Sequence, residues 1–92
     1  MNPVRSQSWF YTYILKCEKT NTLYTGATDN LERRLEQHNN GEVYYTKSRL
    51  PVTLVYFEAC LNKFDAFRRE KYLKTGMGKR FLKNRLKGGL TG

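Results

Sequence analysis

The sequence has little cysteine or histidine and no long hydrophobic run. It contains two cysteines, one histidine and two prolines among 92 residues. No segment approaches the roughly 18 apolar residues that span a bilayer, and the polar stretch 1–8 lacks the apolar core of a signal peptide. Cys17 and Cys60 lie far apart and match no zinc-ligand spacing. We therefore expect two reduced thiols in a cytoplasmic protein with no membrane partner.

Acidic residues are also in short supply. Eight Asp and Glu stand against seventeen Lys and Arg, which gives a formal net charge of +9. A field of this sign attracts polyanions, so we expect DNA as the partner and RNA as an alternative, although a well-solvated surface alone would also explain the charge. The length suits one domain, expected at residues 9–87 with flexible tails at 1–8 and 88–92, in a monomer or a weak dimer.

Three segments have the composition of β-strands. Residues 9–17 are largely aromatic, β-branched or long apolar side chains, which predicts a buried strand. A polar turn separates this segment from a second short strand at 22–26, so the two should form a hairpin. A third strand is expected at 52–59, after a polar loop over 42–50.

Capping residues mark the expected helices. Asp29 has capping-box spacing to Glu32, and Asn62 can cap a second helix. The helices are expected from Asp29 to about Asn39, over 63–74 up to Gly76 and Gly78, and over 79–86. The resulting order, β-β-α-β-α-α, predicts an α+β domain with a small three-stranded antiparallel sheet flanked by helices.

Polar residues interrupt the apolar stripe of the first expected helix. By helical spacing, Arg34 and His38 share a stripe with Leu31 and Leu35, whereas Arg33 points away. An arginine stem that covers apolar surface and a histidine at the edge of the core would explain the pattern structurally. A functional site would explain it equally well.

The second expected helix carries a carboxylate in a similar position. Glu70 lies among Ala66, Phe67 and Leu73 at helical spacing. A carboxylate on such a stripe is costly unless a cation or a donor meets it. A salt bridge to Lys74 or Arg34 would satisfy it, and so would a divalent metal, since Mg²⁺ accepts single-carboxylate sites and keeps most of its waters.

The expected hairpin supplies tyrosines. Tyr11 and Tyr13 alternate on the first strand and should share a face, and Tyr24 lies on the second strand. Strand tyrosines are most often core residues or cross-strand partners. Gly26 at the strand end would let another backbone or a phosphate approach closely.

These residues together resemble the GIY-YIG nucleases. The hairpin segments Tyr11-Thr12-Tyr13 and Tyr24-Thr25-Gly26 resemble the paired motifs that name the family, although Tyr11 and Thr12 stand where the family has Gly and Ile. Arg34, ten residues beyond Tyr24, resembles the catalytic arginine of the family. His38 and Glu70 match its His-or-Tyr position and its metal-binding glutamate. Tyr45-Thr46, together with the segment 50–56, also resembles the small stand-alone members of the family.

The resemblance implies a metal-dependent DNA endonuclease that leaves 5′-phosphate and 3′-hydroxyl ends, in a role such as DNA repair or processing. Mg²⁺ is the expected cofactor, and Mn²⁺ should substitute for it. Glu70 would hold the metal and Arg34 the phosphate. Tyr24, or less favourably Tyr13, would accept the proton of the attacking water, and His38 would orient the tyrosine or relay the proton.

Basic residues late in the chain are candidates for contact with the nucleic-acid backbone, although a solvated helix face would look the same. The expected phosphate or DNA contacts are Gly26, Lys74, Lys79, Arg80 and Lys83. Charge and aromatic content alone would equally suit a non-catalytic DNA- or RNA-binding module, or a small basic protein bound to ribosomal RNA. Neither of these accounts for the joint presence of the tyrosine, arginine, histidine and glutamate.

Overall fold

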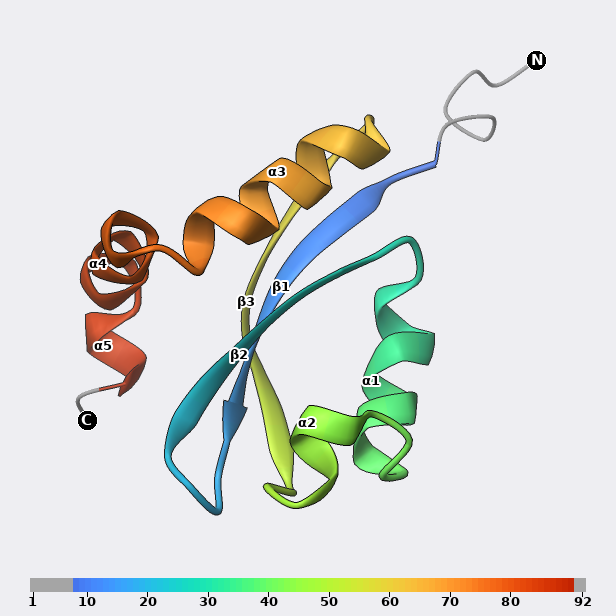
Figure 1. Cartoon of the computed structure of the whole chain (residues 1–92), viewed down its shortest axis with the longest axis vertical. Coiled ribbons are helices and arrows are strands. Elements are labelled where there is room, and N and C mark those ends of the chain that lie inside the picture. Colours follow the sequence, from blue (N-terminus) through green and yellow to red (C-terminus); the bar gives the residue numbers. More distant parts are fainter. Residues whose placement is uncertain (1–7, 91–92) are drawn as a thin grey trace.

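The chain folds into a three-stranded antiparallel sheet with helices on both faces (Figure 1). The structure, a computed structural model, describes residues 8–90. The strands are β1 (Phe10–Cys17), β2 (Thr22–Thr28) and β3 (Val52–Cys60), in the spatial order β2-β1-β3. The α+β class and the β-β-α-β-α-α order are therefore confirmed, with two short helices in addition.

The central strand β1 separates two hydrophobic cores. Tyr13 and Leu15 face the layer formed by α1 (Leu31–Asn39) and α2 (Tyr44–Lys47). Ile14, between them, packs against Leu73 and Leu82 in the opposite layer. That layer consists of α3 (Lys63–Leu73), α4 (Gly76–Arg85) and α5 (Lys87–Leu90). Because both faces are covered, β1 is an almost continuous run of buried residues.

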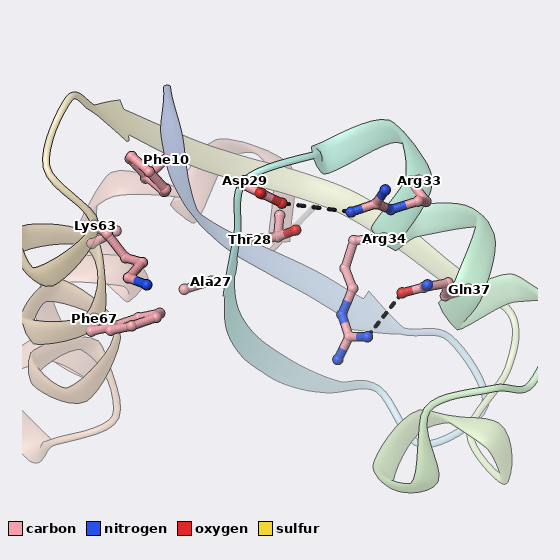
Figure 2. Close-up of a pocket in the computed structure, with 10 residues that line it drawn as sticks. Phe10, Ala27, Thr28, Asp29, Arg33, Arg34, Gln37, Lys63 and Phe67 are labelled. Atoms are coloured by element: carbon pink, nitrogen blue, oxygen red, sulfur yellow. Dashed lines mark hydrogen bonds and ion pairs between the residues drawn. The ribbon is translucent and has the colours of Figure 1, made fainter. Parts of the chain in front are cut away.

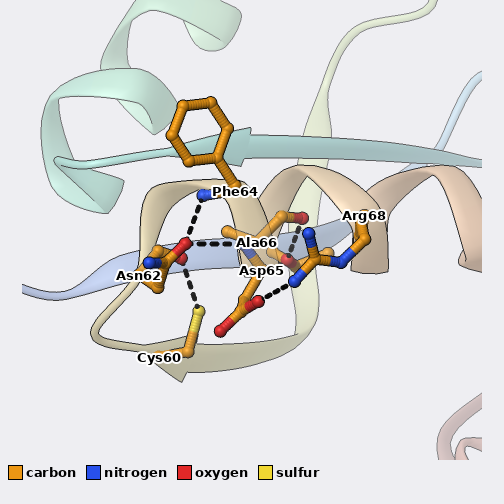
Figure 3. A network of polar contacts seen from close by, with 7 residues as sticks. Cys60, Asn62, Phe64, Asp65, Ala66 and Arg68 are labelled. Carbon is orange, nitrogen blue, oxygen red and sulfur yellow. Dashed lines mark hydrogen bonds and ion pairs between the residues drawn. The ribbon is translucent and has the colours of Figure 1, made fainter.

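The helix starts follow from side-chain caps. Asn62 Oδ1 accepts the backbone N–H groups of Phe64 (2.8 Å) and Asp65 (3.1 Å), as expected for the start of α3 (Figure 3). The predicted cap at Asp29 is wrong by one residue. Asn30 Oδ1 caps α1 by accepting from the N–H of Arg33 at 3.0 Å, and Asp29 forms an exposed ion pair with the Arg33 side chain.

The expected start of the third helix is also wrong. Thr75 Oγ1 accepts the backbone N–H of Gly78 at 3.2 Å, so α4 begins at Gly76 and not at Lys79. A Cβ on Gly78 would lie 2.1 Å from the carbonyl oxygen of Tyr72. The glycine therefore allows the first turn of α4 to contact the end of α3.

The remaining elements differ from expectation in smaller ways. Strand β2 extends to Thr28, and the polar loop contains α2. Cys17 and Cys60 are free. Residues 88–90, which were expected in a tail, belong to α5, while 1–7 and 91–92 lie outside the described residues. Within residues 8–90, no helix is both long and apolar enough to cross a membrane.

Candidate active site

The buried tyrosine of β1 occupies the centre of the site. Tyr13 is fully buried and lies opposite Gly26 of the edge strand β2. A Cβ on Gly26 would lie 2.5 Å from both Cζ and Oη of Tyr13. The close neighbour of this glycine within the protein is thus the Tyr13 side chain rather than another backbone, and its contact with a phosphate stays a prediction. The missing side chain allows the phenol to lie over the edge strand of the sheet.

Helix α1 brings two side chains to this phenol. His38 Nε2 lies 2.9 Å from Tyr13 Oη, and Arg34 Nε donates to the same oxygen at 3.4 Å. The second hydrogen bond of Arg34 runs from Nη1 to Gln37 Oε1 at 2.9 Å. The stripe predicted from helical spacing is confirmed, since His38 is buried and Arg34 half-buried while Arg33 is exposed.

A threonine from α2 completes the cluster. Thr46 Oγ1 lies 2.7 Å from His38 Nδ1, and both side chains are completely buried. Sequence patterns did not single out Thr46 as a site residue, because it lies in a polar loop with no periodicity that could relate it to α1. The resemblance to small stand-alone members includes this threonine, but it assigns no role to it.

The direction of these hydrogen bonds follows from chemistry. A guanidinium can only donate, so the Tyr13 oxygen accepts from Arg34. The Tyr13 proton then finds its acceptor in His38 Nε2, because otherwise it would be buried without a partner. His38 consequently carries its proton on Nδ1 and donates it to Thr46. One continuous chain of donors therefore runs from Arg34 to Thr46.

Burial keeps both rings of this chain uncharged. It lowers the pKa of His38 from its ordinary value of 6.5 to about 4, with a further contribution from the positive charge of Arg34. Burial also raises the pKa of Tyr13 above its ordinary value, although the hydrogen bond from Arg34 opposes this shift. At neutral pH the pair is therefore a phenol and a neutral imidazole, beside an arginine that stays cationic.

Tyr24 packs on this cluster from strand β2. Its ring centroid lies 5.1 Å from that of His38 and 6.3 Å from that of Tyr13. The ring of Tyr45 also lies against it, with the two ring centroids 5.4 Å apart. Tyr24 is half-buried, whereas Tyr13 is fully buried, so of the two candidate tyrosines solvent reaches Tyr24 and not Tyr13.

Glu70 belongs to the opposite layer but lies within electrostatic reach. Its charge contributes to the raised pKa of Tyr13, behind the larger effects of burial and of the two neighbouring side chains Arg34 and Tyr24. The Glu70 side chain is 24% exposed, and its Oε2 accepts from Lys74 Nζ at 3.0 Å. The salt bridge weighed for this carboxylate is thus present, with Lys74 as the partner.

The donor set suits a hard, hydrated cation. Among residues 8–90, no cluster of three or more His, Cys, Asp or Glu side chains could enclose a metal ion. A single accessible carboxylate such as Glu70 fits Mg²⁺, which usually binds through one or two carboxylates together with waters and phosphate oxygens. Lys74 contacts only Oε2 of this carboxylate, so a metal at Glu70 could bind through Oε1 or replace the ammonium group of Lys74 at Oε2.

The other predicted phosphate contacts lie outside this cluster. Lys79, Arg80 and Lys83 are exposed on α4, in the layer opposite α1. Lys74 is engaged by Glu70 in the structure. The site residues brought together around Tyr13 are therefore Gly26, Tyr24, Arg34 and His38, to which the structure adds Thr46.

A groove of about 550 Å³ opens beside Arg34, across the edge strand β2. Figure 2 shows Arg34 entering it from α1, while Lys63 and Phe67 extend from α3 towards Ala27. Tyr13, Tyr24 and Glu70 do not line it, so Arg34 is the link between the groove and the cluster.

Comparison with known proteins places this arrangement in a family. The family model of the GIY-YIG catalytic domain matches residues 9–85. A UPF0213 protein of Clostridium perfringens is 57% identical over 65 residues, covering 70% of this chain and 69% of the relative. A UPF0213 protein of Staphylococcus haemolyticus is 53% identical over 66 residues, covering 71% and 79%.

A solved structure agrees with the sequence relatives. The solution NMR structure of a UPF0213 protein from Bacillus halodurans matches with a TM-score of 0.53 and 38% identity, over 88% of this chain and 87% of that one. The chain therefore belongs to the GIY-YIG catalytic domain family and is similar to its small stand-alone UPF0213 members.

Proposed function

We propose that the protein is a divalent-metal-dependent DNA endonuclease that hydrolyses a phosphodiester bond to leave 5′-phosphate and 3′-hydroxyl ends. The observation that carries this proposal is the hydrogen-bonded set Arg34–Tyr13–His38, with Tyr24 packed on it, in a chain of this family. The net charge of +9 favours a polyanionic substrate. A cytoplasmic role in DNA repair or processing fits these properties.

Arg34 is the group proposed to hold the scissile phosphate. A guanidinium has five N–H donors, and the two hydrogen bonds to Tyr13 and Gln37 engage only part of this set. The remaining donors can meet two phosphate oxygens in the planar geometry that lysine cannot reproduce. The same contacts to Tyr13 and Gln37 fix the orientation of the guanidinium before substrate arrives.

Tyr24 is the tyrosine proposed to accept the proton of the attacking water. Burial and the hydrogen bond to His38 both hold the proton on Tyr13, whose pKa is raised. Tyr24 is reached by solvent and lies against the imidazole of His38. Tyr13 and His38 then act by positioning Arg34 and Tyr24.

Glu70 is proposed to hold Mg²⁺, with Mn²⁺ as a substitute. When bound, such an ion supplies positive charge that stabilises the leaving 3′ oxygen. In the protein without metal, Lys74 neutralises the carboxylate. If a metal ion replaced the ammonium group at Oε2, Lys74 would become available to contact a phosphate oxygen, as its expected role in DNA binding requires.

A cleavage screen over labelled single-stranded, duplex, flap and junction DNA with Mg²⁺ or Mn²⁺ tests this proposal. Glu70→Gln should lower cleavage by several orders of magnitude while DNA binding persists. Glu42→Gln removes an exposed carboxylate from the loop after α1 and serves as the matched control. Binding without hydrolysis on every substrate would instead support a non-catalytic module. Normal cleavage by the Glu70 variant would remove the metal role.

A further inference from the structure

The groove beside Arg34 is positively charged and lies directly next to the proposed phosphate contact. Its lining includes Arg33, Arg34 and Lys63, against the single carboxylate of Asp29. That carboxylate lies 3.7 Å from the Arg33 guanidinium, in an exposed ion pair. The groove therefore keeps an excess of positive charge close to Arg34, which suits a phosphate-bearing ligand.

One wall of the groove is an exposed aromatic ring. Phe67 on α3 is 44% exposed, and Phe10 lies partly exposed at the start of β1. The Phe67 ring is held by an edge-to-face contact with Phe64, with ring centroids 6.4 Å apart. An aromatic side chain beside basic residues is the composition of a stacking platform for nucleobases.

Size and polarity also suit a nucleotide. The groove holds about 550 Å³, within the range of roughly 300–1,000 Å³ that is usual for small-molecule sites. Gln37 lies in the wall formed by α1, and its Oε1 accepts from Arg34. Its amide NH₂ group is a donor that can meet the edge of a base.

We propose that this groove is a subsite for an unpaired nucleotide adjacent to the scissile phosphate. The inference rests on the proposed function and deepens it, because it assigns single-stranded or locally unpaired DNA as the substrate class. The phosphate lies at Arg34 on the α1 side of β2, while the base crosses β2 and stacks on Phe67. A base held in a duplex has its faces covered by neighbouring base pairs and cannot enter the groove.

Binding measurements that separate base from backbone test the inference. Three dye-labelled probes are compared by fluorescence anisotropy in EDTA at fixed salt: a short oligothymidylate, its duplex, and a strand of the same length without bases. The first variant is Phe67→Leu, which keeps apolar volume and removes the ring. Phe67→Tyr retains the ring. Phe57→Leu removes a ring of similar exposure (49%) outside the groove and is the matched control.

Among the three aromatic variants, the expected result is a loss of affinity confined to one variant and one probe. Phe67→Leu should weaken binding of the oligothymidylate by about five-fold to a hundredfold and leave the base-free strand unchanged. Phe67→Tyr and Phe57→Leu should bind like the wild type. Lys63→Gln should weaken binding of both single strands, since it removes a charge.

Several outcomes would overturn the inference. For Phe67→Leu, these are wild-type affinity for the oligothymidylate, or a loss of affinity for the base-free strand equal to the loss for the oligothymidylate. For the wild type, they are binding of the duplex as tight as that of the single strand, or no binding of any probe. Duplex cleavage by the wild type that Phe67→Leu leaves unchanged would overturn the subsite and keep the nuclease. The expected binding pattern without hydrolysis in Mg²⁺ would keep the subsite and overturn the nuclease.

Discussion

Removing one buried hydroxyl tests the polar chain behind the site. Thr46→Val preserves the shape of the side chain but deletes the oxygen that lies 2.7 Å from His38 Nδ1. Both side chains are fully buried, so no water can replace the lost partner without rearrangement. The Nδ1–H group of His38 is then unsatisfied, which costs about 1–3 kcal/mol of unfolding free energy.

The same change should impair catalysis without weakening substrate binding. In the wild type, the hydrogen bond to Thr46 holds the His38 proton on Nδ1 and keeps Nε2 as the acceptor of Tyr13. Without that partner, the alternative tautomer places a proton on Nε2, against the Tyr13 phenol. If the lost interaction energy appears in the tautomer equilibrium, kcat falls by about five-fold to a hundredfold while KM stays nearly constant.

Three measurements examine this prediction. Urea unfolding gives the stability loss, the ¹⁵N shifts of the single histidine give its tautomer, and steady-state cleavage separates kcat from KM. Thr46→Ser keeps the hydroxyl and should retain the tautomer and most of kcat. The reasoning is refuted if Thr46→Val keeps wild-type stability and tautomer, or if the serine variant behaves like the valine variant.

The remaining predictions concern the neighbours of this chain. The pKa of His38 is lowered to about 4 in the folded protein. Between about pH 6.5 and 4, the unfolded protein therefore takes up a proton that the folded protein does not. The unfolding free energy should fall by up to about 3 kcal/mol as the pH is lowered through that window. ¹H NMR of the single imidazole checks the midpoint, and a His38→Gln variant should lose this part of the pH dependence. Gly26→Ala should destabilise by about 1–3 kcal/mol, because its Cβ would overlap a buried phenol, whereas Gly76→Ala, with open space around it, should be tolerated; thermal unfolding compares the two. Arg34→Lys should lower kcat by about 10²–10³-fold, since one ammonium cannot replace the planar fork, and a loss below ten-fold in single-turnover cleavage would contradict the proposed phosphate contact.

Most helices and strands were predicted correctly because the sequence pattern that specifies each of them lies within one short segment of the chain. The continuous apolar run of β1 and the cap at Asn62 lie within single segments, and both were read correctly. The errors arose where two adjacent signals competed. Asp29 and Asn30 can both cap a helix, and in the structure Asn30 has the extended backbone of a cap residue and accepts the N–H of Arg33. Gly76 and Gly78 read as helix breakers, yet Thr75 caps a new helix that contains them.

The site was predictable residue by residue but not as a set of contacts. Helical spacing placed Arg34 and His38 beside the core, and the structure bears this out. Which tyrosine meets them depends on the register of β1 and β2, which places Tyr13 opposite a glycine and so allows its direct contacts. The contact of Thr46 with His38 depends on how α2 folds back on α1, and no local pattern encodes that.

The two cores on either side of one thin sheet have a mechanical consequence. Successive side chains of β1 are anchored alternately in both layers, through Tyr13 on one side and Ile14 on the other. Loosening of the layer formed by α3 and α4 would therefore displace β1, which carries Tyr13. It would also move the Glu70 carboxylate away from Tyr13. The proposed active site should open and close as one cooperative unit, and hydrogen exchange should report similar protection for the amides of β1 and α3.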